Sequence, residues 1–135
     1  MADCFSNITD PPIAFVRGVF VRRQGGSKPV ADEAFVPEVL YGGKYYPICG
    51  HYFWDNDNGA TTVCKALGFI SGARIRTDTV YEADAMPVGE CKSGEALNRC
   101  TGGGNAWGDF GFEGGKCKKY NKGSPVGVQV ICKGK

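Results

Sequence analysis

The first third of the chain alternates between β-forming segments and short polar breaks. Residues 13–23 are rich in valine and phenylalanine, which predicts a strand. Residues 24–29 contain two glycines and a proline and predict a loop. Strand character resumes at residues 34–40, where Pro37 indicates a sheet edge or a bulge, since proline cannot donate a ladder hydrogen bond.

Three further strands are expected downstream, at residues 46–49, 73–80 and 126–132. Residues 41–45 place Gly42 and Gly43 between β-forming residues, which is typical of a tight hairpin, and residues 46–49 are its return strand. Residues 73–80 have strand composition. Residues 126–132 place valines at every second position and predict the last strand.

One segment has helical rather than strand periodicity. Asp57 or Asn58 can cap a helix by accepting backbone N–H hydrogen bonds, and Gly68 supplies a left-handed stop. The predicted helix is only about two turns long and would be marginal alone, so its apolar face must pack on the sheet. That face is formed by residues at helical spacing: Ala60, Val63, Cys64 and Leu67.

These elements predict an α+β domain, in which an antiparallel sheet is combined with one short helix. Residues 1–12 are interpreted as an N-terminal extension, and residues 13–135 as a single domain. The apolar fraction of 42% is ordinary for a folded globule, and the net charge of +2 is too small to indicate specific nucleic-acid binding. No apolar run is long enough for membrane insertion to be expected.

The sequence contains seven cysteines, which bear on how the fold is stabilised and on the cellular compartment. There is no Cys-x-x-Cys pair and His51 is the only histidine, which argues against structural zinc and favours a disulfide framework in an oxidising compartment. An odd number leaves at least one cysteine as a free or intermolecular thiol. Six cysteines alone permit 15 pairings, so spacing does not fix the connectivity.

The disulfide framework predicts an extracellular protein. The first residues are polar and do not form a signal peptide, so we expect that the natural signal or a larger parent chain was removed. Asn7 begins an Asn-Ile-Thr sequon, which is a candidate glycosylation site. Cys4 is interpreted as a free thiol in the extension, or alternatively as the link of a disulfide-bonded dimer or a cross-linked matrix protein.

Several motifs occur together in residues 41–132. The helix segment ends in Cys64-Lys65-Ala66-Leu67-Gly68-Phe69, preceded by Trp54-Asp55, and the other motif residues are Gly43, Lys44, Ile48, Cys49, Cys91, Glu95, Leu97, Cys100, Val126, Gly127, Val128 and Cys132. In the order of its cysteines and in the motifs between them, this set resembles a scavenger receptor cysteine-rich (SRCR) domain of the six-cysteine subgroup. The resemblance covers about residues 14–133.

The resemblance implies a fold and a set of disulfides. The family fold is a curved antiparallel sheet that cradles one helix, in agreement with the pattern above. The implied bridges are Cys49–Cys117, Cys64–Cys132 and Cys91–Cys100, with Cys4 left over.

Many members of this family bind Ca²⁺ or Mg²⁺ through an Asp-Asp pair and a glutamate. Glu95 matches the glutamate, but Gly50 and His51 replace the Asp-Asp pair. Asp55 and Asp57, in a longer loop, are alternative oxygen ligands. The competing interpretation is that Asp57 or Asn58 caps the helix and that Glu95 is solvated or paired.

Basic and aromatic residues are the remaining candidates for binding. Family members often bind polyanions through basic patches, and alternate strand positions place Arg74 and Arg76 on one side. Lys118 and Lys119, with Lys116 and Lys122, form a second basic cluster, and Arg22-Arg23 form a third. The aromatic residues near Cys49 are Tyr45, Tyr46, Tyr52, Phe53 and Trp54; Trp54 is expected in the core, and the others offer a protein- or sugar-stacking surface.

No catalytic motif is present, so the chain is interpreted as a binding module rather than an enzyme. The first hypothesis is a scavenger-type receptor module for anionic or glycan surfaces, assisted by a divalent cation. The second is a protein–protein adhesion module that uses the aromatic surface. The dependence of binding on salt concentration distinguishes these two hypotheses, because polyanion binding weakens with ionic strength and apolar binding does not.

Overall fold

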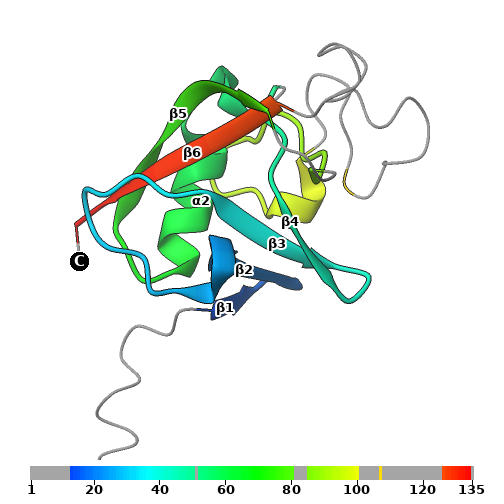
Figure 1. Cartoon of the computed structure of the whole chain (residues 1–135), viewed down its shortest axis with the longest axis horizontal. Coiled ribbons are helices and arrows are strands. Elements are labelled where there is room, and N and C mark those ends of the chain that lie inside the picture. The colour runs from blue at the N-terminus through cyan, green and yellow to red at the C-terminus, as the bar shows by residue number, and fades with distance from the viewer. Residues whose placement is uncertain (1–12, 51, 81–84, 101–106, 108–125, 135) are drawn as a thin grey trace, which may run out of the picture.

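The computed structural model describes residues 13–50, 52–80, 85–100, 107 and 126–134, and these form an α+β fold (Figure 1). The strands are β1 (Ile13–Val16), β2 (Val19–Arg23), β3 (Pro37–Tyr41), β4 (Lys44–Pro47), β5 (Ser71–Val80) and β6 (Val126–Lys133). The helical elements are η1 (Gln24–Gly26), η2 (Phe53–Asp55), α2 (Asn58–Ala66) and η3 (Leu97–Arg99). Outside the described residues lie the predicted extension, with Cys4 and Asn7, and also His51, Cys117, Lys118 and Lys119.

Strands β1 to β4 form an antiparallel sheet in chain order. The single strand predicted for residues 13–23 is wrong, because the chain reverses at Arg17-Gly18 and Val16 pairs with Val19. Both turn residues have positive φ, +50° at Arg17 and +84° at Gly18, as a two-residue hairpin turn of type I′ requires.

The glycine hairpin predicted at residues 41–45 is confirmed, since Tyr41 pairs with Lys44 across Gly42-Gly43. The strand before it begins at Pro37 rather than at residue 34. Phe35 instead forms an isolated bridge with Val130 of β6, with N···O distances of 3.0 and 2.9 Å. This bridge connects the four-stranded sheet with a separate two-stranded sheet, β5–β6, where a single curved sheet was expected.

The predicted helix is confirmed as α2, and its C-terminal stop is a Schellman motif. Gly68 has φ of +97°, its N–H donates to Lys65 O at 3.1 Å, and the N–H of Phe69 donates to Cys64 O at 2.9 Å. The predicted side-chain cap is wrong. Asp57 occupies the N-cap position, but its carboxylate makes no capping hydrogen bond and turns to strand β5 instead.

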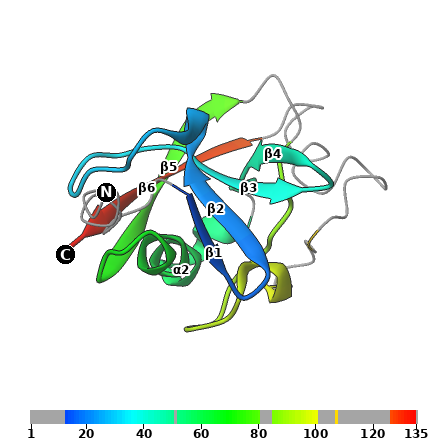
Figure 2. The same cartoon turned by 90° about the horizontal axis from the view of Figure 1, so that it is seen from below.

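Helix α2 lies between the two sheets and packs most closely on β5–β6 (Figures 1 and 2). The contact is so close that a Cβ on Gly72 would lie 2.3 Å from Cys64 Sγ and 2.9 Å from Ala60 O. Thr61 Oγ1 donates to Gly72 O at 3.0 Å, and Cys64 is disulfide-bonded to Cys132 of β6.

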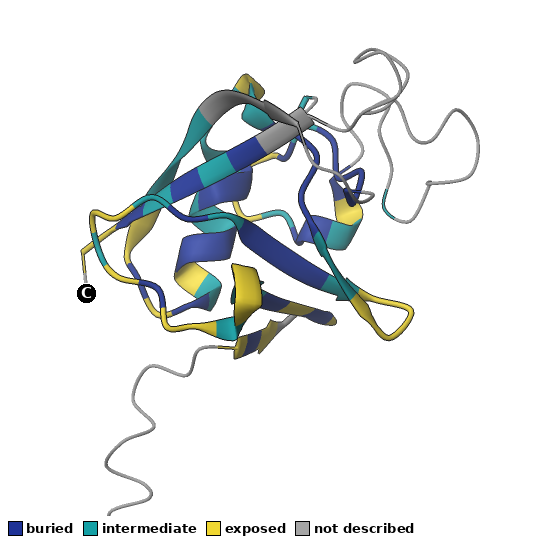
Figure 3. Cartoon of the chain, viewed as in Figure 1, coloured by how far each residue is buried: buried dark blue, intermediate teal, exposed yellow. Residues whose placement is uncertain are grey.

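The core lies between α2 and the two sheets, and Figure 3 shows buried residues, in dark blue, on α2, β3 and β6. Phe53 is fully buried, whereas Trp54, which was expected in the core, is only half-buried. The largest fully buried side chains are Phe53, Ile48, Leu67, Met86 and Leu97. Within the described part of the chain, no helix is long and apolar enough to cross a membrane.

Two disulfides implied by the family resemblance are present, Cys64–Cys132 and Cys91–Cys100. Cys49 is disulfide-bonded as well, and its expected partner, Cys117, lies outside the described residues. The Cys64–Cys132 bridge joins residues 68 positions apart, against 9 for the other bridge. The longer bridge therefore constrains the unfolded chain more strongly.

We expect Gly72→Ala to destabilise the fold, because the added methyl group has no space between β5 and α2. The free energy of unfolding should fall by about 1–3 kcal/mol, measured by urea denaturation without reductant. Ser71→Ala, at the exposed neighbouring position, is the control and should change stability by less than about 0.5 kcal/mol. Equal stability of the two variants would contradict the close packing.

Removal of the two described disulfides should have unequal effects. Chain entropy predicts a loss of about 4 kcal/mol for Cys64→Ala with Cys132→Ala, and about 2.5 kcal/mol for Cys91→Ala with Cys100→Ala. Both pairs of sulfurs are buried, so the cavities left behind are similar. The midpoints of guanidinium unfolding provide the comparison, and the reverse order would show that loop length does not govern how much each bridge stabilises the fold.

Candidate functional site

Arg74, a predicted ligand-binding residue, has a structural role in strand β5. Its Nη1 donates to Asp57 Oδ1 at 2.8 Å, and its Nε donates to the carbonyl oxygen of Trp54 at 2.8 Å. The backbone N–H of Arg74 also donates to Asp57 Oδ1, at 3.0 Å. These contacts hold the loop before α2 against β5. The side chain of Arg76, and Lys118 and Lys119, lie outside the described part of the chain, so ligand binding by this set stays a prediction.

The third predicted basic cluster is also engaged within the fold. Arg22 Nε donates to Glu38 Oε1 at 2.8 Å, and the Arg22 guanidinium lies 3.7 Å from the centroid of the Tyr45 ring. Arg23 Nη1 lies 3.0 Å from Glu33 Oε1. Both guanidiniums therefore face carboxylates of their own chain.

The predicted cation ligands are not assembled into one cluster. Asp55 is exposed, the Asp57 carboxylate contacts Arg74, and Glu95 Oε1 accepts the backbone N–H of Lys92 at 3.0 Å. Among the described residues no group of three histidine, cysteine or acidic side chains is arranged to hold a metal ion. Binding of Ca²⁺ or Mg²⁺ stays a prediction.

Among the described residues, the most exposed aromatic side chains lie elsewhere than predicted. Phe15 and Phe20, which are 62% and 40% exposed, face each other across the β1–β2 hairpin with ring centroids 4.5 Å apart. Near Cys49, by contrast, Phe53 is buried and Tyr45 packs under a guanidinium. Ile13, 40% exposed, lies near the pair on β1.

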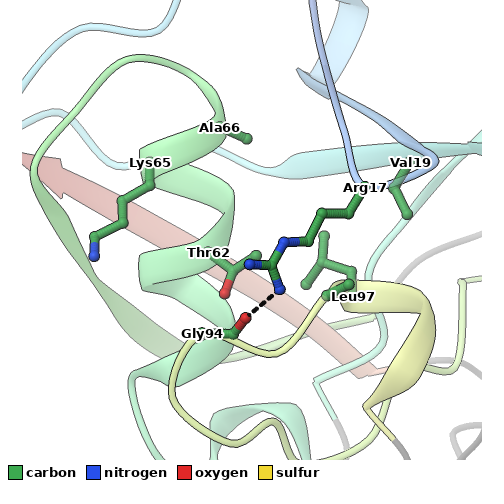
Figure 4. Close-up of a pocket in the computed structure, with 8 residues that line it drawn as sticks. Arg17, Val19, Thr62, Lys65, Ala66, Gly94 and Leu97 are labelled. Carbon is green, nitrogen blue, oxygen red and sulfur yellow. Dashed lines mark hydrogen bonds between the residues drawn. The ribbon is translucent and has the colours of Figure 1, made fainter.

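A pocket of about 270 Å³ lies where the β1–β2 turn, helix α2 and the loop before η3 meet (Figure 4). Arg17 and Lys65 are its two charged lining residues, and both are exposed. In Figure 4 the Arg17 guanidinium points into the space between helix and loop, whereas the Lys65 ammonium points outward from the helix. The remaining lining residues are Val19, Thr62, Ala66, Gly94, Ala96 and Leu97.

The position of Arg17 is fixed from two sides. Its left-handed backbone, at φ of +50°, belongs to the hairpin turn, and its Nη1 donates to Gly94 O at 2.8 Å. The loop that carries Gly94 is closed by the Cys91–Cys100 disulfide. Asn58 Nδ2 also donates to Cys91 O at 2.9 Å, which anchors this loop to the start of α2.

Thr62 contributes a hydroxyl group whose single hydrogen already has a partner within the fold. Its Oγ1 lies 3.1 Å from Asn58 O and 3.3 Å from Glu95 O, both of which are acceptors. A hydroxyl group has one hydrogen to donate, so the hydrogen of Thr62 is directed to one of these carbonyls. Any further hydrogen bond to Thr62 Oγ1 must therefore be donated by another group.

The pocket combines positive charge with an apolar floor. Val19 and Leu97 are each 1% exposed, and Ala96 is 8% exposed. Among the described residues, neither Arg17 nor Lys65 forms an ion pair with a carboxylate. The arrangement is suited to a small ligand that has an anionic group and an apolar group.

The sequence patterns did not reveal this pocket, because Arg17 fell within a segment predicted as one continuous strand. The available signal was Arg17-Gly18 between two β-forming runs, since glycine in a strand pattern marks a turn or bulge. Lys65 lay on the polar face of the predicted helix, where a solvated lysine is ordinary. Only the fold brings the two together.

Loss of the Arg74 guanidinium should destabilise the protein. Arg74→Ala removes a part-exposed ion pair and a hydrogen bond to Trp54 O, together about 1–2 kcal/mol. The matched control is Lys133→Gln, which removes only the exposed ion pair with Asp32 and should cost less than about 0.5 kcal/mol. Thermal unfolding of both variants provides the comparison. An Arg74→Ala protein as stable as the parent would show that these contacts do not hold the loop.

Comparison with known proteins identifies no relative of this chain. No family model matches it, and neither curated proteins nor solved structures give a significant match. A function for the chain is therefore inferred from the residues and geometry described above.

Proposed function

We propose that this protein is an extracellular ligand-binding module of the SRCR type that recognises anionic or glycan ligands, and that it is not itself an enzyme. The disulfides Cys64–Cys132 and Cys91–Cys100 support the family resemblance, because they are two of the three pairings that it implies. Disulfides persist in oxidising compartments, which supports the extracellular location.

The observation that carries the anionic-ligand proposal is the charge of the pocket. Arg17 and Lys65 line one concave surface, and no described carboxylate pairs with either of them. Guanidinium groups bind carboxylate, sulfate and phosphate through charge-assisted hydrogen bonds. By contrast, Arg22, Arg23 and Arg74 each contact a carboxylate of the same chain.

Assistance by a divalent cation is part of this proposal. Asp55 is exposed and close in sequence to Asp57, and hard oxygen ligands of this kind suit Ca²⁺. A cation bound there would act as a bridge to an anionic ligand. Binding assays are therefore best run in parallel with Ca²⁺ and with EDTA.

A specific observation also favours the second function, protein–protein adhesion. The Phe15–Phe20 pair and Ile13 expose apolar side chains on the β1–β2 hairpin. Aromatic side chains of this kind are enriched at protein interfaces. This mode predicts binding that is insensitive to salt and lost in Phe15→Ser.

Heparin provides a direct test of the anionic-ligand proposal. Arg17→Asn should lower the salt concentration at which the protein elutes from heparin, because it removes the guanidinium at the pocket. Asparagine tolerates positive φ better than most residues, so the hairpin turn is retained. Lys65→Gln should have a smaller effect, since its ammonium points outward from the pocket.

Lys133→Gln is the matched control for net charge, because it removes one positive charge from β6, away from the pocket. Its elution should equal that of the parent protein. If all three variants elute at the same reduced salt concentration, retention reflects net charge alone and the pocket is not the site. If none changes and Phe15→Ser abolishes binding to a protein partner, adhesion is the function.

A further inference from the structure

We infer that the pocket between the β1–β2 turn, α2 and the Gly94 loop is a subsite for one acidic, N-acetylated sugar. This inference rests on the proposed function and names the chemical group that the site would take. Three features of the lining carry it: a donor, an acceptor and an apolar floor, each in a fixed place.

The donor is the Arg17 guanidinium. It has five N–H groups, and the hydrogen bond to Gly94 O uses one while fixing the direction of the others. A guanidinium accepts no hydrogen bond, so its natural ligand group is an anion with two oxygens in a plane. A carboxylate meets this requirement in bidentate geometry.

The acceptor is Thr62 Oγ1, whose hydrogen is directed to Asn58 O or Glu95 O. A ligand that bears only a carboxylate would place acceptors against this oxygen. A ligand group that contacts this oxygen must therefore be a donor, through an N–H or an O–H. The amide N–H of an acetamido group provides such a donor.

The floor is formed by small or branched apolar side chains, namely Val19, Ala66, Ala96 and Leu97. A methyl group in contact with this floor loses its exposure to water, which favours binding. The acetyl methyl group lies next to the amide N–H in an N-acetylated sugar. Thr62 and the floor would thus be contacted by one acetamido group.

The size of the pocket suits a single sugar ring. Its volume of about 270 Å³ lies just below the range for small-molecule sites, roughly 300–1,000 Å³. A peptide C-terminus also carries a carboxylate and an amide, but peptide carboxylates are typically captured by nests of backbone N–H groups. Here the charge comes from a side chain, and the neighbouring backbone group, Gly94 O, is an acceptor.

The test uses the full chain and the methyl α-glycoside of N-acetylneuraminic acid, which carries both groups. Three comparison ligands each lack one feature: methyl glucuronide has no acetamido group, N-acetylglucosamine has no carboxylate, and N-acetylalanine has no sugar ring. We expect the sialoside to bind at least about tenfold more tightly than each of them, in titrations followed by amide NMR shifts.

The shifts should be centred on Thr62, Gly94 and Leu97. Arg17→Asn should weaken sialoside binding at least about tenfold, and Thr62→Val should weaken sialoside binding by a larger factor than methyl glucuronide binding, since glucuronide offers hydroxyl groups but no acetamido N–H. Equal loss of both ligands in Thr62→Val, at an unchanged melting temperature, would overturn the acceptor role of Thr62.

Other outcomes separate this inference from the proposed function. Heparin retention that depends on Arg17, without sialoside binding, would overturn the sugar subsite and leave the proposed function standing. Absence of both heparin retention and sialoside binding would overturn both. N-acetylalanine binding as tightly as the sialoside would assign the pocket to a peptide C-terminus instead.

Discussion

The structure depends on the close contact between helix α2 and strand β5. A nine-residue helix is too short to be stable alone, and its buried face gains stability only by packing. Gly72 lets the helix approach until Cys64 and Ala60 occupy the space where a side chain would lie. The Cys64–Cys132 disulfide then ties the same helix to β6. The contact that builds the core therefore also fixes the orientation of the helix and its distance from β5.

Because α2 is fixed in this way, its other face is available to build a site. Cys64 and Val63 point into the core, whereas Thr62, Lys65 and Ala66 line the pocket. The wall facing the helix is also held in place, since the Cys91–Cys100 disulfide closes the loop that carries Gly94. Groups held on rigid elements lose little conformational entropy when a ligand binds. The disulfides thus hold the lining of the pocket in place as well as stabilising the fold.

Local sequence patterns predicted the elements whose conformation is determined by residues close together in the sequence. The helix, its Gly68 stop and the Gly42-Gly43 hairpin follow from periodicity and from the conformational freedom of glycine, and all three were found. The Arg17-Gly18 turn was missed because arginine seldom occupies positive φ, so the pattern favoured one long strand. The Phe35–Val130 bridge depends on residues 95 positions apart, which no local window detects.

The candidate site was harder to predict for a related reason. Arg74 and Arg22-Arg23 were predicted as binding residues because basic residues cluster near them in the sequence. In the fold, each of these arginines instead pairs with a carboxylate of the same chain. Arg17 and Lys65 are 48 positions apart and show no pattern.

At Arg17 the left-handed backbone is unfavourable for a residue with a Cβ, costing about 1–2 kcal/mol, where asparagine or glycine would cost less. The hydrogen bond to Gly94 O offsets part of this cost and leaves the remaining guanidinium donors directed at the pocket. Strain of this kind, at a charged residue on a concave surface, points to binding rather than to stability.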